Sequence, residues 1–400
     1  MNLTYTFSDK AKKICFVLMG IGVIALIYGL ISGAGGQRIW ANLLTNSFFY
    51  LAIGLGATFF LALQYACESA WSTVVKRVIE AVTTYVPIGG MFMLFIFICG
   101  SLHFNHLYEW MDPATYTKGS EEYDEIIAGK HGYLNLPFFF ARALTYILVW
   151  VYFQRSFRKN SLEADLTGDG NYILHDKNIK NAAIFLIFFG VTSSTSAWDW
   201  IMSIDVHWFS TMFGWYTFSG MWVTALIVII LLTLHLKSKG HLEQVNENHL
   251  HDLGKWMFAI SFLWSYLWFC QFMLIWYSNI PEEVTYFMNR WAHYKVLFWV
   301  VFFINFTFPM LILMARDAKR NYKYLTIIGV IIFIGHWLDV YMCVMPGTVG
   351  HEWILFSPLE IGMALGFLGL FLYVVLTSLT KAPLMVKNHP YLEESIHHEF

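Results

Sequence analysis

Long apolar runs alternate with short polar segments along almost the whole chain. A helix needs about 20 mostly apolar residues to cross roughly 30 Å of hydrocarbon. Ten runs have about this length, so the pattern predicts ten transmembrane helices. They lie at 14–32, 47–66, 86–102, 136–153, 182–202, 213–236, 256–277, 294–315, 324–343 and 358–377. The segment 71–85 also has a helical pattern, which would start the third helix much earlier.

The first apolar run begins like a signal peptide, because Lys10, Lys12 and Lys13 precede it. It is longer than the apolar region of a signal peptide, and no A-x-A cleavage site follows it. We therefore interpret 14–32 as a membrane anchor that is retained.

The distribution of Lys and Arg predicts the orientation of the helices. With alternating crossings, the side of the N-terminus holds 19 of the 25 Lys and Arg residues and the other side holds five. Arg142 lies inside the fourth helix. Cytoplasmic loops are enriched in these residues, so we expect both termini on the cytoplasmic side of a bacterial inner membrane.

The fifth and ninth predicted helices share a short motif near the same end. The spacing Asp-x-x-Met occurs at Asp199 and Met202 and again at Asp339 and Met342. Both helices run from the inner to the outer side, so the motif favours an internal repeat.

The repeat predicts how the helices group. Helices two to five, at about 41–204, would form one four-helix bundle, and helices six to nine, at about 213–343, a second. The first and last helices would flank them. The predicted fold class is therefore an all-α membrane protein, with residues 1–400 forming a single polytopic domain.

Composition supports this class and excludes others. Only 13% of the residues are charged, where a soluble domain has about 25%. The formal net charge is −2 and no basic stripe is present, so nucleic-acid binding is not expected. The five cysteines have no C-x-x-C or metal-type spacing, so no metal, iron–sulfur cluster or covalent haem is expected on this chain.

Ionisable side chains inside a bilayer cost about 3 kcal/mol or more, and they usually face a bundle interior or a water-filled cavity. Here they gather in the predicted outer half. Carboxylate and imidazole groups exchange protons near neutral pH where burial adjusts their pKa values. The candidates for a proton pathway are Asp199, His336, Asp339, Arg142, Asp205 and His207. The candidates for contact with a quinone headgroup are His103, His106 and Arg142.

Each candidate also has a purely structural explanation. Arg142 and Asp199 could form a buried ion pair that fixes packing, and His103 and His106 could face lipid headgroups. The five hydroxyl residues at 192–196 could carry a proton wire or bond their own helix backbone. The aromatic residues Trp264, Trp268 and Phe269 are interpreted as packing and interfacial residues. The pair His336 and Asp339, one turn apart on one helix face, is the hardest to explain by packing alone.

Several classes of membrane protein are disfavoured by the histidine pattern. A b-type cytochrome needs paired histidines on facing helices, and a haem–copper oxidase needs a larger cluster. No nucleotide-binding loop or zincin motif occurs. A secondary transporter stays open, although its usual interrupted helices are suggested only by Pro309.

The stretch 196–214, SAWDWIMSIDVHWFSTMFG, resembles the membrane subunits of alternative complex III. These belong to the polysulfide-reductase membrane-anchor (NrfD-like) family. The length of the chain and the N-terminal stretch 4–10 resemble the F-type subunit more than its larger paralogue, the C-type subunit. The resemblance extends over essentially the whole chain.

This resemblance implies a subunit of a quinol-oxidising respiratory complex without a redox cofactor of its own. Menaquinol or ubiquinol would be bound here or on the C-type subunit, and iron–sulfur clusters and c-type haems would lie on periplasmic partner subunits. A terminal cytochrome oxidase is a further implied partner. Four roles stay open: proton handling, an outer quinone site, a structural anchor that docks partners, and a standalone transporter.

Overall fold

The computed structural model describes residues 4–32, 36–167, 170–350 and 356–399. Within these residues the chain is all-α, and ten helices are long and apolar enough to cross a membrane. The predicted fold class, an all-α protein with many membrane spans, is confirmed. The spans are Asp9–Ile31, Gly36–Ala66, Trp71–Ser101, Leu136–Ala164, Ile173–Ile204, Met212–Ser238, Glu247–Ser278, Lys295–Leu313, Tyr322–Thr348 and Pro358–Leu379.

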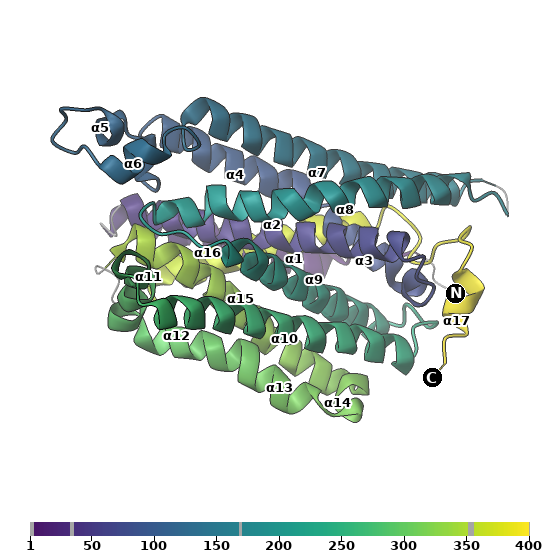
Figure 1. Ribbon diagram of the computed structural model, residues 1–400. Coiled ribbons are helices and arrows are strands. Elements are labelled where there is room, and N and C mark those ends of the chain that lie inside the picture. Colours follow the sequence, from purple (N-terminus) through teal and green to yellow (C-terminus); the bar gives the residue numbers. More distant parts are fainter. Residues whose placement is uncertain (1–3, 33–35, 168–169, 351–355, 400) are drawn as a thin grey trace.

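Short helices and breaks complete these spans (Figure 1). The elements are α1 (Asp9–Ile31), α2 (Gly36–Ala66), η1 (Trp71–Val75), α3 (Lys76–Thr83), α4 (Val86–Ser101), η2 (Glu109–Met111), α5 (Pro113–Tyr116), α6 (Glu125–Lys130), α7 (Leu136–Ala164), α8 (Ile173–Trp200), η3 (Met202–Ile204), α9 (Met212–Ser238), α10 (Glu247–Ser278), α11 (Pro281–His293), α12 (Lys295–Phe302), the π-helical η4 (Phe303–Thr307), α13 (Phe308–Leu313), α14 (Arg316–Arg320), α15 (Tyr322–Thr348), α16 (Pro358–Leu379) and α17 (Leu392–Ile396).

Several helices extend beyond the apolar runs that predicted them. Helix α7 continues to Ala164 rather than ending near 153, and α10 begins at Glu247 rather than near 256. Asn246 caps α10 in a capping box with His249. Hydropathy marks only the part of a helix inside hydrocarbon, whereas capped polar turns continue the same helix outside it.

Both described ends of the chain lie at the same end of the long axis (Figure 1). We call this the terminal end, and we call the opposite end, which carries α5, α6 and α11, the loop end. The even number of spans produces this arrangement. Which end faces the cytoplasm stays a prediction from the distribution of Lys and Arg.

Helices α2 and α9 lie at the centre of the packing. Helix α2 packs against α3, α4, α8, α9, α15 and α16, and α9 packs also against α10 and α15. We call α2, α3, α4, α7 and α8 the first bundle, and α9, α10, α12, α13 and α15 the second bundle. Helix α2 also packs closely on α9 and α15 across the two groups, so the division into two bundles and the repeat that would relate them stay predictions.

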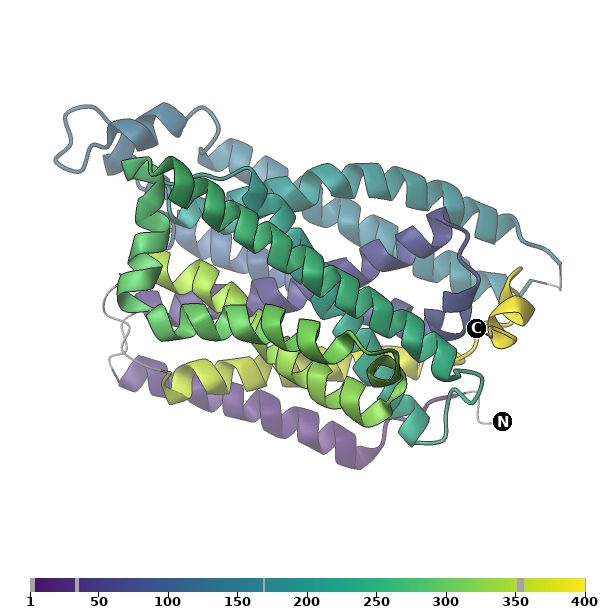
Figure 2. The same ribbon diagram turned by 60° about the horizontal axis from the view of Figure 1, so that its bottom comes forward.

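Helices α1 and α16 form a tight pair, which runs side by side in Figure 2, and α16 packs against α2 and α3 of the first bundle. Glycines allow this close approach. A Cβ at Gly22 would lie 2.6 Å from the Cα of Gly366, and one at Gly362 would lie 2.3 Å from the Cβ of Ala25. Small residues at such contacts are typical of helix pairs in membranes.

The C-terminal tail crosses the terminal end and contacts both bundles. Ser395 donates to the carbonyl of Trp71 at 2.9 Å, and its own carbonyl lies 2.9 Å from Nε2 of His249. Nε2 of His398 lies 2.8 Å from the carboxylate of Asp252. The tail therefore connects η1, which lies between α2 and α3 of the first bundle, to α10 of the second.

Candidate functional site

Asp199 of α8 is held by Arg142 of α7. The guanidinium donates through Nε and Nη2 to the two carboxylate oxygens, at 2.8 and 2.9 Å. Asp199 is fully buried, and the Arg142 side chain is only 10% exposed. This bidentate geometry is the strongest form of the pair, and it compensates both charges inside the first bundle.

The remaining contacts of Arg142 fix the pair in place. Its Nη1 donates to the carbonyl of Tyr133 at 3.1 Å, and its guanidinium carbon lies 3.9 Å from the centre of the Tyr133 ring. The Phe138 ring lies on it at 4.2 Å. Tyr146, one turn along α7, donates to Asp199 at 3.4 Å. The two charges therefore have little freedom to separate.

The hydroxyl residues before Asp199 bond mainly to their own helix. Thr192, Thr195 and Ser196 donate to backbone carbonyls three or four residues earlier. Thr192 also accepts from the indole of Trp150 at 3.0 Å. Of the two interpretations of this run, the structure favours the local one, because these hydroxyl protons are already engaged.

Asp339 of α15 occupies the corresponding motif of the second bundle and has different partners. Tyr216 of α9 donates to Oδ1, and the indole of Trp264 of α10 donates to Oδ2 at 3.0 Å. Nδ1 of His336 lies 3.9 Å from Oδ2, and this ring carries a charge only when it is protonated. Three helices thus converge on a buried carboxyl through donors that carry no permanent charge.

His336 makes the fewest hydrogen bonds of this group. It is 2% exposed, and neither ring nitrogen has a hydrogen-bond partner among the described residues. The edge of its ring meets Trp264, with the ring centres 5.3 Å apart. A buried imidazole without partners is costly, which marks it as a group retained for another reason than packing.

A π-helical turn brings a further polar side chain to the same place. Asn305 in η4 is fully buried, and neither atom of its amide has a partner within the described chain. A Cβ at Gly335 would lie 2.1 Å from its Oδ1, so the amide lies against the residue before His336. Pro309 cannot donate to the carbonyl of Asn305, which explains why the helix changes its pattern here.

Two small cavities adjoin the carboxyl of Asp339. One, of about 20 Å³, is lined by His336, Asp339, Tyr216 and Cys343 among others. The other, of about 30 Å³, is lined by Asp339, Tyr216, Cys343, Gln271 and Arg290 among others. A polar cavity of about 10–15 Å³ already holds one water. Each is therefore large enough to hydrate this carboxyl.

Arg290 of α11 connects this cluster to the loop end. It is 3% exposed and donates to the carbonyls of Met342 and Cys343 at 3.2 and 3.4 Å. Its Nη2 also donates to Asp205 at 3.2 Å, and the Asp205 side chain is 26% exposed. The groups from His336 to Asp205 thus extend from the bundle interior to the surface.

The other predicted residues lie apart from the buried cluster. His207 is half exposed, and its Nε2 lies 2.7 Å from Asp124 in the long loop. That hydrogen bond lowers the pKa of Asp124. His103 and His106 are exposed, with ring centres 6.4 Å apart. Their positions match the interpretation as residues at the membrane surface.

The expectation that ionisable residues gather mainly at one end was incomplete, because the terminal end holds a second buried group. Arg77 of α3 donates to Glu80 at 2.6 Å and also to Asp165, and the three side chains are 8% exposed or less. His389 of the tail packs on His175, with ring centres 4.7 Å apart. Burial, and then the charge of Lys76, lowers the pKa of His389. The apolar runs hid these residues because they lie in helical turns outside the runs.

Four side chains that lie around Asp339 and His336 are not among the functional candidates that the sequence predicts. Trp264 was interpreted as a packing residue, and it donates a hydrogen bond. Tyr216 lies two residues beyond the quoted 196–214 stretch, and Arg290 was counted only as a loop charge. A signal was available for Asn305, because an amide four residues before Pro309 sits where a helix loses a hydrogen bond.

Among the described residues, no group of three or more His, Cys, Asp or Glu side chains could hold a metal ion. No known family model and no curated protein sequence matches this chain.

Proposed function

We propose that this chain is a proton-handling membrane subunit of a quinol-oxidising respiratory complex. The single observation that carries the proton role is the cluster of Asp339 and His336. A buried carboxyl has only uncharged donors, a buried imidazole has unpartnered nitrogens, and two water-sized cavities adjoin them. Such a set can take up and release a proton, because no Arg or Lys in the described part of the chain forms an ion pair with this carboxyl.

The direction of transfer follows from the connected polar groups. A proton held between His336 and Asp339 reaches the loop end through water beside Tyr216 and Cys343, past Arg290, to Asp205. Tyr216 can donate and accept through the same hydroxyl. Arg290 stays charged and orients the route rather than passing the proton itself.

The assignment to a respiratory complex rests on the resemblance of residues 196–214 to the membrane subunits of alternative complex III, in particular the F-type subunit. On this proposal the partners are the C-type membrane subunit, periplasmic iron–sulfur and c-type haem subunits, and a terminal oxidase. The membrane is then the bacterial cytoplasmic membrane, with the terminal end inside. Electrons from quinol would pass through those partners.

The decisive test is proton release per quinol oxidised in vesicles that contain the intact complex. We expect Asp339→Asn and His336→Gln each to lower this ratio while quinol oxidation continues. Tyr216→Phe, which keeps the ring and removes the hydroxyl, should lower it less. Normal coupling in a fully assembled Asp339→Asn complex would exclude the relay.

A surface carboxylate supplies the matched control. Asp124→Asn removes an equal charge at the loop end, outside the buried cluster. We expect its coupling to equal that of the unmodified complex. A similar loss in this variant would show that the assay responds to surface charge, and the relay assignment would fail.

Membership of a complex needs its own test. Pull-down of the chain from its native membranes, followed by a haem stain, should recover haem-containing partners. Recovery of the chain alone, with transport activity in vesicles, would favour a secondary transporter instead. The interrupted span at η4 is the observation that keeps this second candidate in view.

A further inference from the structure

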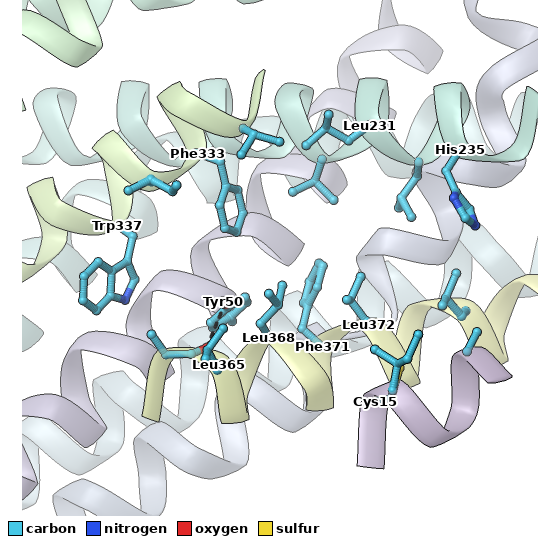
Figure 3. A pocket seen from close by; sticks show the side chains of 18 residues that line it. Cys15, Tyr50, Leu231, His235, Phe333, Trp337, Leu365, Leu368, Phe371 and Leu372 are labelled. Carbon is cyan, nitrogen blue, oxygen red and sulfur yellow. Dashed lines mark hydrogen bonds between the residues drawn. The ribbon is translucent and has the colours of Figure 1, made fainter. Parts of the chain in front are cut away.

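An apolar groove separates the α1–α16 pair from α9 and α15 (Figure 3). Its volume is about 580 Å³. Leu231 and Phe333 lie on one wall, and Leu368, Phe371 and Leu372 lie on the other. Folded interiors contain few voids larger than a water molecule, so a gap of this size at membrane depth is a place for hydrocarbon.

The groove is reached from the bilayer. Ile14, Val330 and Ile334 line it and are each exposed by more than 40% of their surface. The tight glycine contacts between α1 and α16 keep that pair together, so the pair does not spread to fill the gap. The groove therefore stays open because α1 and α16 pack tightly on each other.

The length of the groove matches one membrane leaflet. His235 lines it near the terminal end of α9, and Trp337 lines it at the deep end. Along α16 the lining runs from Ala364 at the deep end to Leu376, twelve residues or about 18 Å at 1.5 Å per residue. One leaflet contributes about 15 Å of hydrocarbon. A single acyl chain that enters from the terminal end would therefore reach the deep end.

The polar groups show which end holds a headgroup. At the deep end, Trp337 donates to Asn46 at 3.0 Å and Tyr50 donates to the carbonyl of Ala364 at 3.4 Å, so both donors are used. At the mouth, Lys10 is one turn before Ile14, and Lys239 is one turn after His235. The deep end thus suits hydrocarbon and the mouth suits an anion.

We infer that this groove binds one acyl chain of an anionic phospholipid, with the phosphate beside Lys10, His235 and Lys239. The free lysines complement the phosphate, and the apolar walls take the chain. An isoprenoid quinone fits less well, because the donors of Trp337 and Tyr50 in the described lining at the deep end are already engaged. The inference rests on the membrane fold and not on the proton role.

The first test uses native mass spectrometry of the full chain after delipidation. We expect one phosphatidylglycerol to bind, more tightly than phosphatidylcholine with the same chains. Leu231→Trp and Leu368→Trp fill the groove and should weaken binding at least tenfold. Leu148→Trp, at a lipid-exposed position of α7, is the matched control and should change nothing. Unchanged binding in both groove variants would overturn the inference.

The headgroup position has its own variants. Lys10→Gln and Lys239→Gln should each weaken phosphatidylglycerol binding about fivefold, the effect typical of one lysine near an anionic surface. Their binding of phosphatidylcholine should not change. Equal losses for both lipids would contradict a phosphate at the mouth and overturn the orientation.

A fluorescence measurement that keeps the groove walls unmodified guards against misfolded variants. Phosphatidylglycerol brominated near the chain end should quench Trp337, seen as the difference from Trp337→Phe. Bromine near the headgroup should quench it less. The reverse order, or displacement of the lipid by an isoprenoid quinone, would exclude this occupant.

Discussion

Asp199 in the first bundle and Asp339 in the second occupy matching Asp-x-x-Met motifs, yet their carboxylates meet different partners. Asp199 accepts two hydrogen bonds from one guanidinium, at 2.8 and 2.9 Å. Asp339 accepts from a phenol and an indole and lies beside two cavities. The carboxylate of Asp199 is compensated by the permanent charge of Arg142, and the pair connects α7 to α8. The carboxylate of Asp339 is surrounded by groups that suit proton exchange.

This difference shows that depth and motif do not decide the role of a buried carboxyl. The partner across the bundle does, because a bidentate Arg fixes the ionised form while neutral donors can serve either form. The predictions below are ordered from the largest expected effect on stability to the smallest.

The largest effect should follow loss of the guanidinium in the first bundle. Arg142→Ala leaves Asp199 buried without a cation, and such a change typically costs about 3–5 kcal/mol. Thermal unfolding in nanodiscs should show a large fall in the midpoint. The double variant Arg142→Met with Asp199→Leu should recover most of the loss, because a well-packed apolar pair often replaces a buried ion pair. If Arg142→Ala is as stable as the unmodified chain, the pair of Arg142 and Asp199 has no structural role.

A second effect tests the packing around the second carboxyl. Gly335→Ala would place its Cβ 2.1 Å from Oδ1 of Asn305 and 2.4 Å from Cγ2 of Ile304. We expect a loss of about 1–3 kcal/mol from overpacking, measured by thermal unfolding. Gly329→Ala on the same helix meets nothing closer than 3.4 Å and is the control. Equal stability of the two variants would mean that η4 moves freely.

A third prediction compares the loss of the charge of Asp339 with the loss of the charge of Asp199. Asp339→Asn keeps the shape and loses one of two accepted hydrogen bonds, so we expect a cost of about 1 kcal/mol. Asp199→Asn should cost more, because Arg142 then keeps a buried charge without a counterion. The order of the two unfolding midpoints checks this. A larger loss for Asp339→Asn would reverse the roles assigned to the two bundles.

The smallest effect concerns the terminal end, away from both Asp199 and Asp339. The folded-state pKa of His389 is below its ordinary value, since burial disfavours the charged ring. Docking of the tail is therefore fully stabilised above about pH 6.5 and weakens as the pH falls below that value. The hydrogen-exchange protection factors of residues 383–399, which correct for the slower intrinsic exchange at lower pH, should fall between pH 7.5 and 5.5. The variant His389→Gln should lose this dependence, which separates tail effects from any pH effect at Asp339.

Much of the architecture could be predicted from hydropathy alone. The apolar runs identified all ten candidate spans, and the even number places both termini at one end. The last turns of α7 and the first turns of α10 could not be read from these runs, because both stretches are polar. Helix α11 was missed for a related reason, since its polar first turn, with Glu282 and Glu283, breaks the apolar pattern.

The sequence by itself determined which ionisable residues must lie at membrane depth, because an apolar run of about 20 residues forces its polar members into hydrocarbon. Only the tertiary structure decided what each of them meets. Arg142 reaches Asp199 across 57 residues of chain, and Tyr216 reaches Asp339 across 123. Such contacts depend on the rotation and register of packed helices, which hydropathy does not encode. That geometry makes Asp199 part of an ion pair and leaves Asp339 beside water-sized cavities.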